Sequence, residues 1–307
     1  MDIILFQGIN AMATIGRSFG TLKNMNINEI KGLCDKYGFK PNKQYGQNYL
    51  INDGIVKKII EAAELKSTDT VVEIGPGFGI LTFALAERVK KVIAFEIERK
   101  LEPYWEKVIE DWKIKRLKDH EIEIVWGNAL AKLTTYNLQL TTYKVVANIP
   151  YQITSYVLRA LLELENKPEM IVIMVQKEVA ERICARKGEM SLLSIAVQYY
   201  GEPKIIAKVP AGSFWPRPKV ESAILKIKIE RLKDLKISES GKFDKRFFRV
   251  VRAGFAQKRK MLWSNLAKGL KIDGEKVKEI LREVVGNEKV RAEEVVVEEW
   301  RAIVSRL

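Results

Sequence analysis

Short apolar runs alternate with stretches of helical periodicity through most of the chain. The runs are rich in Val and Ile and are bounded by turn residues, which predicts strands over 70–74, 92–95, 122–125, 144–147, 170–175, 205–209 and 223–229. Apolar residues three and four apart predict helices over 28–36, 53–63, 80–88 and 155–164, and two more that begin near 176 and 188. We expect Asn28 and Asp53 to cap the first two helices. Such alternation predicts a doubly wound, Rossmann-like α/β sheet whose ligand lies at the carboxyl ends of its strands.

The pattern changes after Glu230. Residues 231–242 are polar and linker-like, a helix follows over 244–262, and further short helices are expected over 273–307. We therefore expect a sheet domain over 27–230 and a small all-helical C-terminal domain over 231–307. Residues 1–26 match neither domain and are interpreted as an N-terminal extension, either a frayed tail or a transit segment.

The composition of the chain limits which partners and which kinds of catalytic site are expected. The 307 residues include 47% hydrophobic residues and carry a net charge of +14, which favours a polyanionic partner, nucleic acid first. One histidine and two distant cysteines exclude a Cys/His zinc site and argue against Ser-His-Asp or Cys-His catalysis. The low cysteine content fits a reducing compartment, so we expect a cytoplasmic protein with no metal. No apolar run is long enough to span or anchor in a membrane.

The first predicted strand ends in a glycine-rich turn. Glu73 ends this strand, and Gly75, Gly77 and Gly79 follow before the next helix. Strand, glycine turn and helix are typical of a nucleoside-binding βαβ unit. An acid at this position would repel a pyrophosphate but attract a cation, and S-adenosylmethionine carries a sulfonium and an ammonium group. The turn therefore predicts a methyl donor as the cofactor, in preference to NAD.

Two other strand ends complete the predicted cofactor site. Glu96 ends the second strand, where an acid can accept hydrogen bonds from ribose hydroxyls. Asn128 follows the third strand, where a polar side chain can bind the amino group of an adenine. Both positions lie at the sheet edge that carries the glycine turn.

The fourth strand leads into Asn148-Ile149-Pro150-Tyr151. The Asn148 oxygen and the Ile149 carbonyl can each accept a hydrogen bond from an exocyclic amino group. Pro150 holds the backbone extended, and Tyr151 can lie against the face of a base. The four residues alone are equally compatible with a strand-end turn around a partly buried tyrosine.

Two loops and one helix offer further candidates. The basic, aromatic stretch over 40–50 is either a solvated loop or an arm that touches substrate or cofactor. The stiff loop over 210–222 is either a packed turn or a second aromatic platform, from Phe214, that faces Tyr151. In the helix over 244–262, Lys245, Arg249, Arg252 and Arg259 share one face. That face could be merely solvated over a small bundle, but the nearby 257–260 run favours contact with phosphates.

Taken in order, these motifs resemble the KsgA-type rRNA adenine dimethyltransferases from about Tyr37 to the C-terminus. The matching stretches are 46–50, 73–82, 148–151, 176–178, 214–222 and 256–260. The resemblance implies a class I methyltransferase sheet that transfers methyl groups from S-adenosylmethionine to N6 of two adjacent adenosines near the 3′ end of small-subunit rRNA. It also implies a monomer that acts on rRNA and on the immature small subunit in ribosome biogenesis.

The resemblance assigns roles to individual residues. The implied catalytic residues are Asn148, Ile149, Pro150, Tyr151 and Phe214. The implied cofactor-binding residues are Gln47, Asn48, Leu50, Glu73, Gly75, Gly77, Glu96, Ile97, Asn128, Ala129 and Asn148. The implied RNA-binding residues are Lys43, Arg217, Lys245, Arg249, Arg252, Lys258, Arg259 and Lys260. The chain departs from the family at Asn128, usually Asp, and at Ile149, commonly Pro or Leu, where only the backbone carbonyl is needed.

Three alternatives compete with this interpretation. DNA adenine and protein glutamine methyltransferases also use an Asn/Asp-Pro-Pro-Tyr motif, but the Gln47-Asn48 arm and the Phe214 loop argue against both. Single-adenosine methyltransferases of large-subunit rRNA share the 216–222 pattern, and the basic C-terminal helix leans toward the dimethylating branch. A ribosome-assembly factor whose methylation is secondary would also explain the basic helix.

Overall fold

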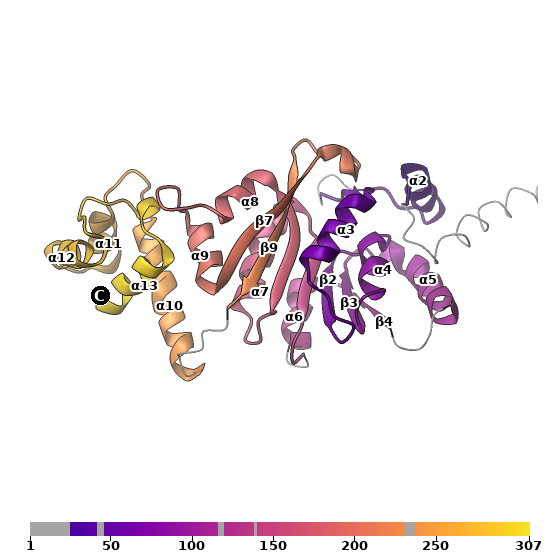
Figure 1. Cartoon of the computed structure of the whole chain (residues 1–307), viewed down its shortest axis with the longest axis horizontal. Coiled ribbons are helices and arrows are strands. Elements are labelled where there is room, and N and C mark those ends of the chain that lie inside the picture. Colours follow the sequence, from indigo (N-terminus) through magenta and orange to yellow (C-terminus); the bar gives the residue numbers. More distant parts are fainter. Residues whose placement is uncertain (1–24, 42–45, 116–119, 138–139, 231–236) are drawn as a thin grey trace, which may run out of the picture.

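The computed structural model describes residues 25–41, 46–115, 120–137, 140–230 and 237–307 (Figure 1). Seven strands form one sheet, in the spatial order β4 (Glu121–Trp126), β3 (Lys91–Glu96), β2 (Thr70–Ile74), β5 (Lys144–Asn148), β6 (Met170–Gln176), β9 (Ser222–Ile229) and β7 (Gly201–Val209). Neighbouring strands from β4 to β6 are parallel, whereas β9 is antiparallel to both β6 and β7. The sheet is thus doubly wound, as predicted, with one reversed strand near its edge.

The helices of the sheet region cover both faces. Adjacent residues of a strand point to opposite faces, so Val71 packs in one apolar core and Val72 in another. The Val71 core includes side chains from α2 (Ile27–Lys36), α3 (Asp53–Ala62), α4 (Ile80–Ala86) and α5 (Glu102–Lys115). The Val72 core includes side chains from α6 (Ala129–Asn137), α7 (Thr154–Glu163), α8 (Lys177–Ile183) and α9 (Leu192–Tyr200).

Short elements complete the sheet region and help to place its loops. β1 (Tyr49–Leu50) and β8 (Phe214–Trp215) form a separate antiparallel pair. Single 3₁₀ turns occur at η2 (Arg99–Leu101), η3 (Tyr151–Ile153) and η4 (Ala211–Ser213), and η5 (Ala292–Glu294) lies in the C-terminal region.

Two predicted helix caps were wrong by one or two positions. Asn26 caps α2, since its side-chain oxygen accepts from the backbone N–H groups of Asn28 and Glu29. The Glu29 carboxylate accepts in return from the N–H of Asn26, at 2.8 Å, which completes a capping box. In α3 the cap is Asn52 rather than Asp53, with a 3.2 Å bond from the N–H of Ile55. An acceptor side chain before the first turn satisfies N–H groups that the helix itself leaves unpaired.

The C-terminal helices are α10 (Ile237–Gly254), α11 (Leu262–Leu270), α12 (Gly274–Val285) and α13 (Val297–Arg306). The prediction of one helix over 244–262 was wrong, because α10 ends at Gly254 and a turn precedes α11. A Cβ on Gly254 would lie 2.3 Å from the Trp300 ring, so only glycine fits there. The Asn265 amide nitrogen donates to the Gly254 carbonyl at 2.7 Å and to the Gln257 carbonyl at 3.0 Å, which holds the break in place.

A polar and aromatic junction joins these helices to the sheet region through α9, at the left of Figure 1. The Tyr199 hydroxyl donates to Asp244 of α10 at 2.6 Å, and the Arg301 guanidinium of α13 donates to the Tyr199 carbonyl at 2.7 Å. Phe247 stacks on the Tyr199 ring with 4.2 Å between centroids. The predicted boundary near residue 230 adjoins 231–236, and most of the predicted extension falls in 1–24; both segments lie outside the described residues. None of the described helices combines the length and apolar character needed to cross a bilayer.

Candidate active site

A cavity of about 500 Å³ opens at the carboxyl ends of β2, β3, β4 and β5. The strand order reverses between β2 and β5, which is the usual place for a ligand in such sheets. All eleven residues predicted to bind cofactor line this cavity, together with Ile149, Pro150 and Tyr151. Segments that are far apart in sequence therefore meet at one site of a size that suits a nucleoside cofactor.

The glycine turn after β2 brings backbone to the cavity. Gly75 has a φ of +74°, and a Cβ built on it would meet no atom within 4 Å, so this residue faces open space. Gly77 has a φ of +56°, and a Cβ there would lie 2.6 Å from the Tyr49 ring. The turn thus requires glycine for its conformation at both positions and for close packing at Gly77.

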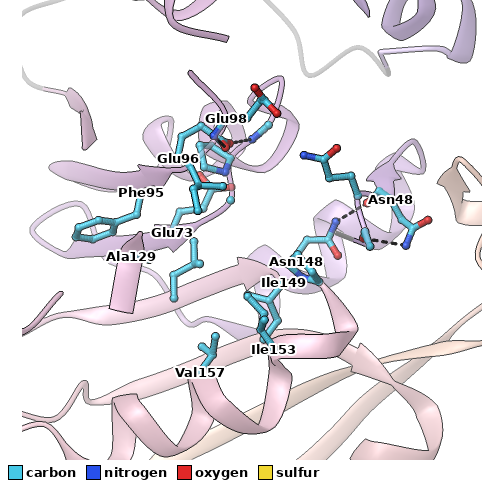
Figure 2. Close-up of a pocket in the computed structure, with 18 of the residues that line it drawn as sticks. Asn48, Glu73, Phe95, Glu96, Glu98, Ala129, Asn148, Ile149, Ile153 and Val157 are labelled. Carbon is cyan, nitrogen blue, oxygen red and sulfur yellow. Dashed lines mark hydrogen bonds between the residues drawn. The ribbon is translucent and has the colours of Figure 1, made fainter. Parts of the chain in front are cut away.

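Two buried acids lie beside the turn, grouped in one part of the lining in Figure 2. Glu96 is 5% exposed and accepts from the N–H of Gly77 at 3.0 Å and of Glu98 at 2.7 Å. Burial raises the pKa of Glu96, while these backbone N–H groups oppose the rise. Glu73 is 1% exposed, and its Oε2 has no hydrogen-bond partner among the described residues. Burial, with a further contribution from Glu96, raises the pKa of Glu73 to about 8.

The Asn148 amide is oriented by the arm at 46–50. Its Nδ2 donates to the Asn48 main-chain carbonyl at 3.0 Å, and Figure 2 shows the two side by side. The Asn148 oxygen has no hydrogen-bond partner within the described part of the chain. The amide therefore keeps an acceptor for a ligand, at the end of the strand that also presents the Ile149 carbonyl.

Tyr151 lines the same cavity with a half-buried ring. Its hydroxyl lies 2.5 Å from the Ser222 hydroxyl, and burial raises its pKa. The ring is thus held at its hydroxyl end and offers a surface against which a flat group can pack.

Asn128 lies in the lining, but its side chain also has a local partner. Its Oδ1 accepts from the Leu130 N–H at 2.9 Å at the start of α6. A carbonyl oxygen has a second lone pair, so Asn128 can still accept one more bond. The capping bond constrains the direction from which that bond can come.

Phe214 is not among the residues that line the cavity. It is 3% exposed and lies opposite Leu50 in the β1–β8 pair, within the apolar core. The sequence prediction of a Phe214 platform facing Tyr151 is therefore not met in this conformation. Stacking of Phe214 on a base remains a prediction.

Sequence reasoning missed the first turn of α7. Ile153 and Tyr156 line the cavity and are 37% and 64% exposed. With Ile97, 68% exposed, they make up three of the eight exposed large hydrophobic residues in the described chain. Large apolar side chains seldom gather on an exposed surface without a partner, so this cluster around the cavity points to a ligand. A second tyrosine five residues beyond Tyr151 was the available signal.

The basic face, defined as Lys245, Arg249, Arg252, Lys258, Arg259 and Lys260, is exposed throughout. None of the six forms an ion pair within the described chain, whereas Lys278, Arg282 and Arg306 of α12 and α13 each pair with a glutamate. Arg259 lies in the turn after α10, so its predicted place on the α10 face was wrong, because the helix has already ended at Gly254. Arg217 is exposed on the loop after β8, and Lys43 lies outside the described residues.

The residues that line the cavity fit S-adenosylmethionine. An unpartnered oxygen on buried Glu73 suits a cationic ligand, and Glu96 offers a carboxylate beside the open glycine turn. The exposed Ile97 offers an apolar surface for an adenine. These two carboxylates and the apolar surface therefore match a positively charged adenosyl ligand better than a dinucleotide.

Comparisons with known proteins agree with this chemistry. The family model described as ribosomal RNA adenine dimethylase matches residues 38–307. A protein named ribosomal RNA small subunit methyltransferase A from Dehalococcoides mccartyi strain 195 is 39% identical over 90% of this chain and 91% of its own length. The protein of the same name from Clostridium botulinum strain ATCC 19397 is 39% identical over 90% of this chain and 96% of its own length.

Solved structures extend the comparison to the fold. The 23S rRNA methyltransferase ErmE is 26% identical, with a TM-score of 0.66 over 85% of this chain and 99% of that chain. A dimethyladenosine transferase from Plasmodium falciparum is 26% identical, with a TM-score of 0.64 over 83% and 95% of the two chains. This chain therefore belongs to the ribosomal RNA adenine dimethylase family of S-adenosylmethionine-dependent methyltransferases.

Proposed function

We propose that this protein transfers methyl groups from S-adenosylmethionine to N6 of two adjacent adenosines near the 3′ end of small-subunit rRNA. The observation that carries the proposal is the Asn148 amide, whose nitrogen is bound to the Asn48 carbonyl and whose oxygen is left as an acceptor. An acceptor pair from Asn148 and the Ile149 carbonyl matches the two hydrogens of an adenine amino group. The names of the relatives support small-subunit rRNA as the substrate.

The cofactor would lie between the glycine turn and the ends of β3 and β4. Glu96 would accept from its ribose hydroxyls, and Asn128 with the Ala129 backbone would bind the adenine edge. Gln47, Asn48, Leu50, Glu73, Gly75, Gly77 and Ile97 would complete the enclosure. When bound, the cofactor supplies an electrophilic methyl group on its sulfonium.

The residues of this chain would contribute orientation more than acid–base chemistry. An adenine N6 is a poor nucleophile because its lone pair is delocalised into the ring. Asn148 and the Ile149 carbonyl would hold both hydrogens and favour a pyramidal nitrogen whose lone pair is available. Tyr151 would pack on the base after it leaves the helix stack, and Tyr156 would border it or the cofactor adenine. The amine loses its proton after attack, so no dedicated base is required.

The basic face would contact the phosphate backbone of the rRNA, together with Arg217 and Lys43. Its six cations have no ion-pair partner among the described residues, which suits a polyanion, and the helices beside it contact the sheet region through α9. We further propose that the protein acts as a monomer in the cytoplasm, on the immature small subunit, during ribosome biogenesis.

The test is mass spectrometry of small-subunit rRNA after incubation with the protein and S-adenosylmethionine. We expect N6-dimethyladenosine at two adjacent positions. Asn148→Ala should reduce transfer by about 10²- to 10³-fold, since a positioned group that acts in the transition state is lost. Binding of S-adenosylhomocysteine should stay within a few-fold of wild type. Wild-type turnover in this variant, or no dimethyladenosine with the parent protein, would contradict the proposal.

Methylation of large-subunit rRNA is the second candidate, because the ErmE structure superposes over most of the chain. Parallel reactions on isolated small and large subunits separate the two, since a large-subunit enzyme would label only the latter. A role as an assembly factor that occupies the subunit would coexist with catalysis. It predicts that the Asn148→Ala protein still cosediments with immature small subunits.

A further inference from the structure

Ser222 reaches the active site through Tyr151. The two hydroxyl oxygens lie 2.5 Å apart, and Ser222 is fully buried and does not line the cavity. It is the first residue of β9 and lies opposite Gln176 of β6 and Val209 of β7. The serine is therefore fixed by strand pairing on both sides, and its hydroxyl connects the rigid sheet to a ring in the cavity.

The segment that ends at Ser222 also supports Asn148. Residues 210–222 and 46–51 form one unit, here named the support ribbon, in which β1 pairs with β8 and the Ile51 N–H donates to the Ser213 carbonyl at 2.9 Å. The residue just before β1, Asn48, presents the carbonyl that accepts from the Asn148 amide. The segment after β8 leads to Ser222. Both polar groups of the 148–151 motif are thus held from the ribbon side.

We infer that Ser222 is a positioning residue for methyl transfer, and that its hydroxyl holds the Tyr151 ring at the place where it stacks on the target adenine. This inference rests on the proposed function, which makes an adenine the target. Swing of a tyrosine about χ1 moves its hydroxyl oxygen and is therefore limited when that oxygen is hydrogen-bonded. The contact also gives the 214–222 motif a role at the site while Phe214 itself is buried.

The strand does not depend on the serine hydroxyl. Backbone pairing holds β9 at this point, and the Lys177 N–H donates to the neighbouring Glu221 carbonyl at 3.0 Å. Ser222→Ala removes one oxygen from this place and leaves the ladder intact. The substitution therefore tests the side-chain contact with little change to the fold.

The test is a double-mutant cycle on rRNA methylation. We expect Ser222→Ala and Tyr151→Phe each to lower kcat/KM for RNA by about 3- to 10-fold, the effect of one hydrogen bond. The double variant should be no worse than either single variant, because both remove the same contact. Binding of S-adenosylhomocysteine should be unchanged in all three.

Thr154→Ala is the matched control. Its hydroxyl is also buried near the motif, but Oγ1 has no hydrogen-bond partner among the described residues. We expect wild-type kcat/KM for this variant and an additive effect when it is combined with Tyr151→Phe. The control shows whether loss of any buried hydroxyl in this region lowers activity.

Several results would overturn the inference. Wild-type kcat/KM in Ser222→Ala would do so, as would a double variant whose loss is the product of the single losses. An equal loss of cofactor affinity would also do so, since it would indicate general damage to the cavity. If the parent protein does not methylate rRNA, the proposed function is overturned and the inference with it. If the parent protein methylates rRNA and Ser222→Ala does so equally well, only the inference is overturned.

Discussion

The cavity and the basic face differ in how their polar side chains are held. At the cavity, Glu96 is buried and Asn148 is half-buried, and each is held by a distant segment: Glu96 accepts from the Gly77 N–H and Asn148 donates to the Asn48 carbonyl. On the basic face, the cations are exposed and form no ion pairs within the described chain. Figure 1 shows α10, which carries half of the basic face, apart from β2 and β3, whose ends border the cavity, and the C-terminal helices contact the sheet region through α9.

The difference matches what each region has to recognise. A methyl transfer needs a few groups at fixed positions, because misplacement of a reacting atom by an ångström costs much of the rate. A phosphate backbone presents repeated charges, and flexible cations can follow it without fixed geometry. Substitutions in the cavity should therefore have large effects that are weakly sensitive to salt. Substitutions on the basic face should have smaller, cumulative effects that depend on salt.

Among substitutions that act on ligand binding, the largest effect is expected at Glu96. Its carboxylate accepts hydrogen bonds from two backbone N–H groups and lines the cavity. Glu96→Ala therefore removes a predicted ribose acceptor and loosens the glycine turn. We expect affinity for S-adenosylhomocysteine, measured by calorimetry, to fall by roughly 30- to 100-fold, the effect of losing hydrogen bonds to a charged group. The fall should be nearly the same at low and high salt.

Glu106→Ala serves as the control for charge, since Glu106 is an exposed acid on α5 outside the cavity. It should bind the ligand like the parent protein. If Glu96→Ala binds the ligand normally while the fold is intact, the assignment of the ribose site to this edge is wrong.

The basic face should respond to combined substitution. The triple variant Lys245→Ala, Arg249→Ala, Arg252→Ala removes three exposed cations from α10. We expect roughly 10- to 30-fold weaker binding of an rRNA fragment near physiological salt, and a shallower dependence of log K on log salt by about two to three. Cofactor affinity should not change.

The matched control replaces Lys278 and Arg282 of α12, which already pair with Glu275 and Glu288. These losses should leave the salt slope of RNA binding unchanged. Equal slopes in the triple variant and the control would show that the two faces do not differ in their contact with RNA.

Sequence reasoning was strongest where a local pattern and a chemical requirement coincide. The strand prediction at 70–74 matches β2, and the glycines after it adopt left-handed conformations that few other residues accept. Parallel strands bring their carboxyl ends to one edge, so the strand pattern alone was enough to place Glu73, Glu96, Asn128 and Asn148 together.

It was weakest where tertiary contacts decide the outcome. The sequence predicted Phe214 as an aromatic platform facing Tyr151. Pairing of β8 with β1 instead buries its ring beside Leu50, and no local pattern indicates that pairing. Apolar spacing predicted that the helix runs on past Gly254. The Trp300 ring that requires a glycine there lies 46 residues away in sequence, so no local pattern indicates the end of the helix. Ser222 could not be linked to Tyr151 without the sheet that brings them together.

The titration of Glu73 predicts a smaller effect at the cavity. Burial raises the pKa of Glu73 to about 8, so the carboxyl is mostly protonated at neutral pH in the free protein. A cation bound beside it favours the ionised form, so binding releases a proton and affinity falls as pH drops below about 8. From about pH 8 to pH 6.5 we expect affinity for S-adenosylmethionine to fall by roughly 10-fold.

Glu73→Gln removes this titration and leaves those of Glu96, whose pKa burial also raises, and of the cofactor's own ammonium group. The variant should bind with a flatter pH profile over the same range, as measured by calorimetry in buffers of different ionisation enthalpy. Identical profiles for the two proteins would show that Glu73 does not exchange a proton when the cofactor binds.

The smallest effect is expected at Asn128, where one oxygen serves both as a cap and as a predicted adenine acceptor. The Leu130 N–H already occupies one lone pair of its Oδ1. An aspartate at this position has two oxygens, one for the cap and one for an adenine amino group, and its charge is favoured at the N-terminus of α6. Asn128→Asp should therefore tighten binding of S-adenosylhomocysteine by about 2- to 5-fold, the value of one improved exposed hydrogen bond.

The same substitution also separates cofactor binding from catalysis. If Asn128 only binds adenine, KM for S-adenosylmethionine should fall with kcat unchanged, because the bond is equal in the ground and transition states. Sinefungin or adenosine can serve as a second ligand, since both carry the adenine edge and should gain the same factor. A gain for S-adenosylhomocysteine that adenosine does not share would place the effect away from adenine. Asn128 would then act only as the cap of α6, and the adenine acceptor would have to be sought among the backbone groups of Ala129 and Leu130.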